Sequence, residues 1–299
     1  MELDRSIAVD WSAANRPVEG ADSIWICEAD RHGAVVSLTN PPTRAEAMAA
    51  LADRARAAVR VGERLIVGVD AGFGYPAGFA SALTGESDWR AVWHRLADEL
   101  TDDDANRSNR FEVAAALNRA IGGDDGPFWA GPPSAIGPDL TARRGPMPMR
   151  PATGAPLSEY RLVEHHLRER SRRPHSVWKL YTPGSVGSQT LLAIARLERL
   201  RREPELADHV RIWPFEVDAA CLERRPLVLL VELWPELAAP DLTAHPVRDG
   251  AQVLAAAGWL TRLAAAGELE DLLLLRAVDA EQRRLARAEE GWILGAELA

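Results

Sequence analysis

Cysteine is scarce in this chain of 299 residues, which contains only Cys27 and Cys221. Two cysteines cannot form the multiple bridges of a small secreted domain, and they are too few for a cysteine-based zinc site. No His-x-x-x-His or Cys-x-x-Cys pair offers zinc ligands at a suitable spacing either. Both cysteines lie in or beside apolar runs, so we expect them to be buried thiols of the core.

Long apolar runs are also missing. No stretch approaches the roughly 20 uninterrupted apolar residues of a membrane-spanning helix. The first residues lack the basic and apolar regions of a signal peptide, so the cytoplasm is the expected location, with no membrane partner. Hydrophobic residues still make up 47% of the chain. That content is enough for one large α/β core that carries an insertion.

Excess positive charge is absent, because the net charge is −9. This balance argues against a general nucleic-acid-coating protein, but not against an enzyme that holds divalent metal through carboxylates. Lys179 is the only lysine among 35 basic residues. Residues 141–180 depart from the acidic average, with nine basic side chains against three acidic ones. This segment indicates either an acidic partner or a solvated helix face.

Short apolar runs and one amphipathic helix account for the first 70 residues. We expect the helix over residues 43–60, started by a Thr43 cap with Glu46 three residues later. Strands are predicted over residues 6–10, 23–28, 34–38 and 65–70. The first three of these form an antiparallel meander, whereas the fourth is apolar throughout, as in a strand buried on both faces.

The rest of the chain divides into an irregular part and a regular part. Residues 72–175, approximately, are predicted to be a largely helical, cap-like insertion into a single domain of residues 1–299, with helices over 89–100, 109–121 and 158–170. The regular pattern then predicts strands over 177–181, 210–215 and 227–233, and helices over 189–202, 248–265, 272–278 and 282–289. The resulting order, β-β-β-α-β-α-β-α, is that of a ribonuclease H-like mixed sheet flanked by helices.

Carboxylates stand at the ends of the predicted strands. Asp10 and Asp70 each end an apolar run, Glu232 lies near the end of a later one, and Asp249 lies in the first turn of the helix that follows. If the first and fourth strands are parallel neighbours, their carboxylates meet at the sheet edge where open α/β sheets place ligands. Side-by-side carboxylates repel each other unless a cation binds them. Oxygen ligands of this kind suit Mg²⁺ or Mn²⁺.

Five motifs resemble those of a bacterial family of unknown function whose members are predicted to be ribonuclease H-like nucleases. They are Ile-Ala-Val-Asp10-Trp-Ser, Val-Gly-Val-Asp70-Ala-Gly-Phe-Gly-Tyr-Pro, Gly184-Ser-Val-Gly-Ser-Gln, Glu232-Leu-Trp-Pro-Glu and Asp249-Gly-Ala-Gln. The resemblance implies that Asp10, Asp70 and Asp249 bind metal, and it places Glu232 in a motif of less defined role. Gly250 stands where alanine would be expected, which weakens the helix start by less than about 1 kcal/mol.

This reading predicts two-metal hydrolysis of a phosphodiester, with Asp10 bridging the ions and Asp70 and Asp249 completing their ligand shells. The catalytic candidates are thus Asp10, Asp70, Glu232 and Asp249. Glycine-rich loops and basic side chains are the candidates for binding phosphate. These are Gly72, Gly74, Gly184, Ser185, Gly187, Ser188, Arg143, Arg144 and Lys179, with Arg172 and Arg173 as further candidates for steering or holding phosphate.

Two other functions remain open at this point. An actin-like ATPase or phosphotransferase shares the strand-then-Asp opening and uses glycine-rich loops on nucleotide phosphates, although it usually needs a second copy of the core. A non-catalytic binding or regulatory protein could retain the fold, and its acids would then be paired with arginines. The substrate is equally open between DNA, RNA, a nucleotide and another phosphate ester.

Overall fold

A six-stranded mixed sheet with the strand order β3-β2-β1-β4-β6-β5 forms the centre of the computed structural model, which describes residues 1–123 and 125–299. Neighbours β1, β2 and β3 pair antiparallel, whereas β4, β6 and β5 continue the sheet in the direction of β1. The strands are β1 (Arg5–Asp10), β2 (Trp25–Asp30), β3 (Val35–Thr39), β4 (Arg64–Asp70), β5 (Val210–Ile212) and β6 (Leu227–Glu232). The predicted meander and the parallel pairing of the first and fourth strands are confirmed.

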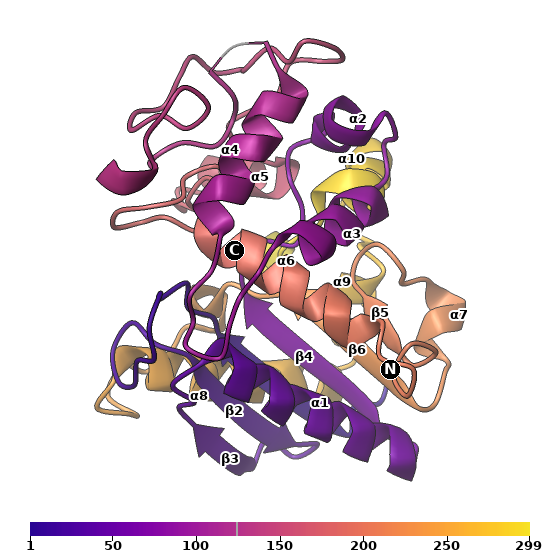
Figure 1. The fold of residues 1–299 in the computed structure, drawn as a ribbon. Coiled ribbons are helices and arrows are strands. Elements are labelled where there is room, and N and C mark those ends of the chain that lie inside the picture. Colours follow the sequence, from indigo (N-terminus) through magenta and orange to yellow (C-terminus); the bar gives the residue numbers. More distant parts are fainter. Residues whose placement is uncertain (124) are drawn as a thin grey trace.

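Helices cover both faces of this sheet. Figure 1 shows α1 (Arg44–Val61) in front of the strands and α8 (Arg248–Ala265) behind them. The start of α1 is confirmed, because the Thr43 side chain accepts a hydrogen bond from the Glu46 N–H. No helix within the described ranges is long and apolar enough to cross a membrane.

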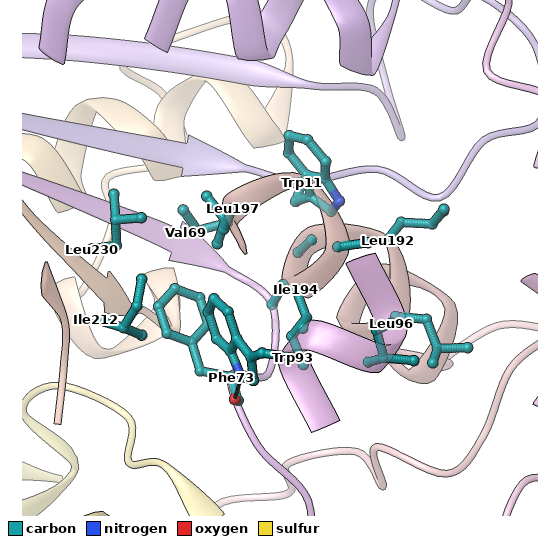
Figure 2. Close-up of a cluster of buried hydrophobic side chains, with 14 of the residues drawn as sticks. Trp11, Val69, Phe73, Trp93, Leu96, Leu192, Ile194, Leu197, Ile212 and Leu230 are labelled. Atoms are coloured by element: carbon teal, nitrogen blue, oxygen red, sulfur yellow. Dashed lines mark hydrogen bonds between the residues drawn. The ribbon is translucent and has the colours of Figure 1, made fainter. Parts of the chain in front are cut away.

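Alternate residues of each central strand supply two separate cores. In β1, Ile7 and Val9 belong to the cluster beneath α1 and α6 (Gly187–Arg201), whereas Ala8 belongs to the cluster beneath α8. Figure 2 shows the first cluster, where strand residues such as Val69 and Leu230 lie beside helix residues. Cys27 and Cys221 are both free and buried in the second cluster, as expected.

The predicted insertion packs directly on the helical layer of the sheet. It contains α2 (Phe79–Thr84), α3 (Trp89–Glu99), α4 (Arg110–Ile121) and α5 (Leu162–Glu169), while its residue Asp124 lies outside the described residues. Trp93 and Leu96 of α3 share the first core cluster with the strands (Figure 2). The remaining short helices are α7 (Ala219–Leu222), α9 (Leu269–Leu273) and α10 (Ala280–Leu285), and a π-helical turn follows over Ala286–Glu290.

Three predicted elements differ from the structure. Residues 177–181 do not join the sheet, and Lys179 makes only an isolated bridge to Trp129, because this apolar run is buried beneath the insertion. The helix predicted from residue 158 begins at Leu162. The helix predicted over 272–278 instead covers Leu269–Leu273, and Leu275 adopts a φ of 53°, which a right-handed helix does not allow.

Candidate functional site

Three parallel strands end on a carboxylate at the same edge of the sheet. Asp10 at the end of β1 lies opposite Asp70 at the end of β4 in the strand register. Glu232 ends the neighbouring β6 and lies opposite Val69. Each strand is buried along its apolar residues. The acid that follows these residues therefore lies at the edge of the sheet.

Asp10 and Asp70 have no neutralising partner. Neither carboxylate accepts a hydrogen bond or forms an ion pair with any residue that the structure describes. Burial raises the pKa of Asp10 well above its usual range, and the negative charges of Asp70, Asp249 and Asp22 raise it further. Burial likewise raises the pKa of Asp70 to about 7, with added repulsion from Glu232 and other nearby acids. The positive charge of Arg248 opposes this rise at Asp10, but it forms no ion pair with that carboxylate, so the pair is a site of concentrated negative potential.

Asp249, in the first turn of α8, is close enough to Asp10 and Asp70 for its charge to act on both. Its charge contributes to the raised pKa of both Asp10 and Asp70, which shows that the three acids act on one another. One Asp249 oxygen accepts the Asp22 N–H at 2.8 Å and so holds the loop before β2. Gly250 is explained by the packing there, because a Cβ atom on it would lie 2.3 Å from Nδ1 of the His245 ring.

Glu232 reaches the same edge but is fully engaged by Arg161. The two guanidinium nitrogens donate to its two oxygens at 2.6 and 2.8 Å, and the Phe73 N–H donates to it at 2.9 Å. Arg161 also pairs with Glu164 at 2.7 Å, and all three charged side chains are buried. We therefore assign Glu232 to holding the backbone that follows Asp70, since its oxygens have no freedom to act on a substrate.

A cavity of about 230 Å³ opens beside Asp70. Arg173 and His175 of the insertion and Gln189 of α6 line it together with Asp70, and the Arg161–Glu232 pair also contributes to its wall. Sequence reasoning missed Arg161, Gln189 and the placement of His175. The only sequence signal for Arg161 was Glu164 three residues later, which is a common spacing on helices. The partner Glu232 is 71 residues away.

The glycines after Asp70 serve close packing. The Gly72 N–H already donates to Oγ1 of Thr190 at 3.2 Å, and a Cβ on Gly72 would lie 2.9 Å from that oxygen. A Cβ on Gly74 would lie 2.4 Å from the carbonyl oxygen of Glu290. These two glycines were predicted to bind phosphate. The N–H of Gly72 already has an acceptor, and Gly74 packs against the C-terminal segment.

The loop before α6 is held closed by its own contacts. The Gly187 N–H donates to the carbonyl of Lys179 at 2.9 Å, and Oγ of the buried Ser188 donates to the carbonyl of Leu180 at 2.7 Å. Gly184 has a φ of +72°, and a Cβ on it would lie 2.8 Å from the His175 ring. Of the four predicted phosphate-binding residues here, Ser185 and Ser188 line a neighbouring groove, and Ser188 is already hydrogen-bonded.

The three predicted basic residues lie outside the lining of the cavity. Arg144 forms an ion pair with Glu159, and Arg143 is exposed. Lys179 donates to the carbonyl of Pro183 at 2.7 Å, and its Nζ lies 5.8 Å from the centroid of the Trp129 ring. In contrast, Arg173, which the sequence also suggested for steering or holding phosphate, lies in the cavity wall.

A divalent cation fits this edge only in part. Within the described ranges, no group of three or more histidine, cysteine, aspartate or glutamate side chains is arranged to hold a metal ion. The predicted ligand set of Asp10, Asp70 and Asp249 is therefore not assembled as a closed cage. Asp10 and Asp70 remain suitable, because Mg²⁺ usually takes one or two carboxylates and fills its other positions with water and substrate phosphate.

No protein-family model, no curated protein and no solved structure matches this chain. The geometry of the sheet edge and its charges are what point to a function.

Proposed function

We propose that this protein is a divalent-metal-dependent phosphodiesterase, most specifically a nuclease, built on a ribonuclease H-like core. One observation carries the proposal: Asp10 and Asp70 lie in register at the ends of adjacent parallel strands, and no hydrogen bond or ion pair from a described residue reaches either carboxylate. Burying unpaired carboxylates together is costly, and a bound cation removes that cost. Mg²⁺ and Mn²⁺ are the cations that such oxygen ligands prefer.

The topology supports the ribonuclease H-like part of the proposal. Strands β1, β2 and β3 form the antiparallel meander, and β4 and β6 then extend the sheet parallel to β1. In this interpretation β5 is an additional short strand at the outer edge. The described residues contain one such sheet, whereas an actin-like phosphotransferase usually has two copies of the core.

In the proposed hydrolysis, the residues of the site have three roles: binding the metal, orienting the substrate and positioning the backbone. Asp10 and Asp70 would hold the metal, with Asp249 adding negative potential from α8. The bound ion would supply Lewis-acid chemistry, polarising the phosphate and acidifying a water. Arg173 and His175 line the cavity together with Asp70 and would orient the anionic substrate. The Arg161–Glu232 pair would keep the backbone after Asp70 in position through the Phe73 N–H.

The test is cleavage of labelled single-stranded and duplex oligonucleotides with Mn²⁺ or Mg²⁺. We expect wild type to cleave one of them, and we expect Asp10→Asn and Asp70→Asn each to lower the rate by at least about a hundredfold, since each removes a ligand charge. Asp53→Asn and Asp98→Asn remove the same charge from exposed helix surfaces and serve as matched controls. Metal-dependent cleavage that survives both site substitutions would contradict the proposal.

A further inference from the structure

The segment 168–175, which we call the basic arm, carries an unusual set of arginines. It begins at the end of α5 and leaves Arg168, Arg170, Arg172 and Arg173 exposed. Arg168 lies over the Tyr160 ring, with Cζ 4.3 Å from the centroid, and therefore has an aromatic partner. The side chains of Arg172 and Arg173 make no hydrogen bond or ion pair with any residue of 1–123 or 125–299.

Acidic residues outnumber basic ones in this chain, 44 to 35, and several exposed arginines pair with a carboxylate, as Arg144 does with Glu159 and Arg248 does with Glu236. Arg172 and Arg173 are adjacent in the sequence, and neither has such a partner among the described residues. Two adjacent guanidiniums without an acid repel each other and present rigid forks of N–H donors to the solvent. Such a pair suits phosphate groups brought by another molecule.

The basic arm ends inside the candidate site. Arg173 and His175 line the same cavity as Asp70, so the arm leads from the protein surface to the acidic edge. A neighbouring groove of about 560 Å³ begins one residue away in the sequence: Val186 lines the cavity, and Ser185 lines the groove. Tyr181 lines that groove and is 45% exposed, which offers a face on which a base could stack.

The dimensions favour one strand over two. Asp70 lies in a cavity of about 230 Å³, which is below the usual volume of sites that enclose a drug-sized ligand, roughly 300 Å³ or more. A basic track with an aromatic beside it is the arrangement that binds single strands through backbone and base.

We propose that the basic arm, with Arg172 and Arg173, binds the phosphate backbone of a single-stranded nucleic acid and directs it into the cavity beside Asp70. The inference rests on the proposed function for its placement of the reacting phosphate. It adds the substrate class and the residues that select it. Single-stranded DNA and single-stranded RNA both offer such a phosphodiester chain. Comparing the binding of DNA and RNA strands of the same sequence shows which of the two the protein prefers.

The experiment is fluorescence anisotropy of a labelled single strand with the full-length protein in EDTA, so that binding is measured without metal or cleavage. Arg172→Gln with Arg173→Gln is expected to weaken binding by about tenfold at low salt and to reduce the slope of log affinity against log salt by about 1.4. Arg172→Lys with Arg173→Lys is expected to retain most of that slope, because the charges remain.

The matched control is Arg31→Gln with Arg60→Gln. These arginines are also exposed, and they lie at the far end of the sheet, in the β2–β3 turn and in the last turn of α1. We expect this control to bind as wild type does. Equal affinity of the arm variant and wild type would overturn the inference, and so would equal binding of a duplex or a mononucleotide.

Failure of the inference and failure of the proposed function give different results. If the arm variant loses binding while wild type shows no metal-dependent cleavage, the proposed function fails and the arm remains a strand-binding surface. If wild type cleaves and the arm variant binds and cleaves equally well, the nuclease function stands and the inference about the arm is wrong. Far-ultraviolet circular dichroism of each variant confirms that the exposed substitutions leave the fold intact.

Discussion

Two groups of carboxylates at one sheet edge differ in how the protein treats their charge. Glu232 and Glu164 are buried around Arg161, which donates to both. Asp10 and Asp70, on the adjacent strands, have no such donor among the described residues. A carboxylate with an internal cation contributes to the structure, whereas an unpaired buried carboxylate is stabilised by taking up a proton or by binding a cation from outside. This difference supports the proposal that Asp10 and Asp70 bind the ligand while Glu232 holds the backbone beside them.

The largest expected effect comes from removing the shared cation. Arg161→Met leaves Glu232 and Glu164 buried without a partner, and it should lower the free energy of unfolding by about 3–5 kcal/mol. Urea denaturation measures this loss. The control Arg144→Gln breaks an exposed ion pair and should cost less than about 1 kcal/mol. A loss from Arg161→Met no larger than that of the control would refute the structural role assigned to Glu232.

A second prediction concerns the unpaired Asp70 carboxylate, whose removal should raise the free energy of unfolding. Because the folded pKa of Asp70, about 7, exceeds its unfolded value, stability is lost as pH rises from about 4 through 7. In EDTA, Asp70→Asn should therefore be more stable than wild type at pH 8, by of the order of 2 kcal/mol, with little difference at pH 4. Thermal unfolding across this range checks it, and a destabilised Asp70→Asn at pH 8 would show that the carboxylate is compensated.

The smallest effect is expected from Asp249, which contributes potential from outside the sheet. Asp249→Asn keeps an oxygen that can accept the Asp22 N–H, so the loop before β2 should stay in place. Removing the negative charge should lower the pKa of both Asp10 and Asp70. Carbon-detected NMR titration of the aspartate carboxyl groups measures these shifts. Unchanged titration of both groups would separate Asp249 from the site.

The sequence carried enough information to predict the strand ends but not the state of their charges. An apolar run that stops at an acid indicates where a buried strand reaches solvent, so Asp10 and Asp70 could be placed at an edge. Whether a carboxylate is paired depends on contacts between distant segments. Glu232 looks like Asp70 in sequence, and only the fold reveals that Arg161 neutralises it.

The errors have a similar origin. The apolar run over 177–181 satisfies the pattern of a short strand, but the same pattern also describes an extended segment buried under a loop-rich insertion. Glycine-rich stretches likewise have two uses. Gly72 and Gly187 were predicted to bind phosphate, and this stays a prediction: Gly72 lines the cavity beside Asp70, while the N–H groups of the two glycines donate to Thr190 and Lys179, which no local pattern could indicate.

The most direct measurement is titration calorimetry of Mn²⁺ and Mg²⁺ into wild type, into Asp10→Asn with Asp70→Asn, and into Arg161→Met if it folds. The account predicts that wild type binds the ions at millimolar concentration or below, and that the double aspartate variant loses this binding. Binding that persists in the double variant, or wild type that binds neither ion even with a single-stranded oligonucleotide present, would contradict the claim that Asp10 and Asp70 form the metal site.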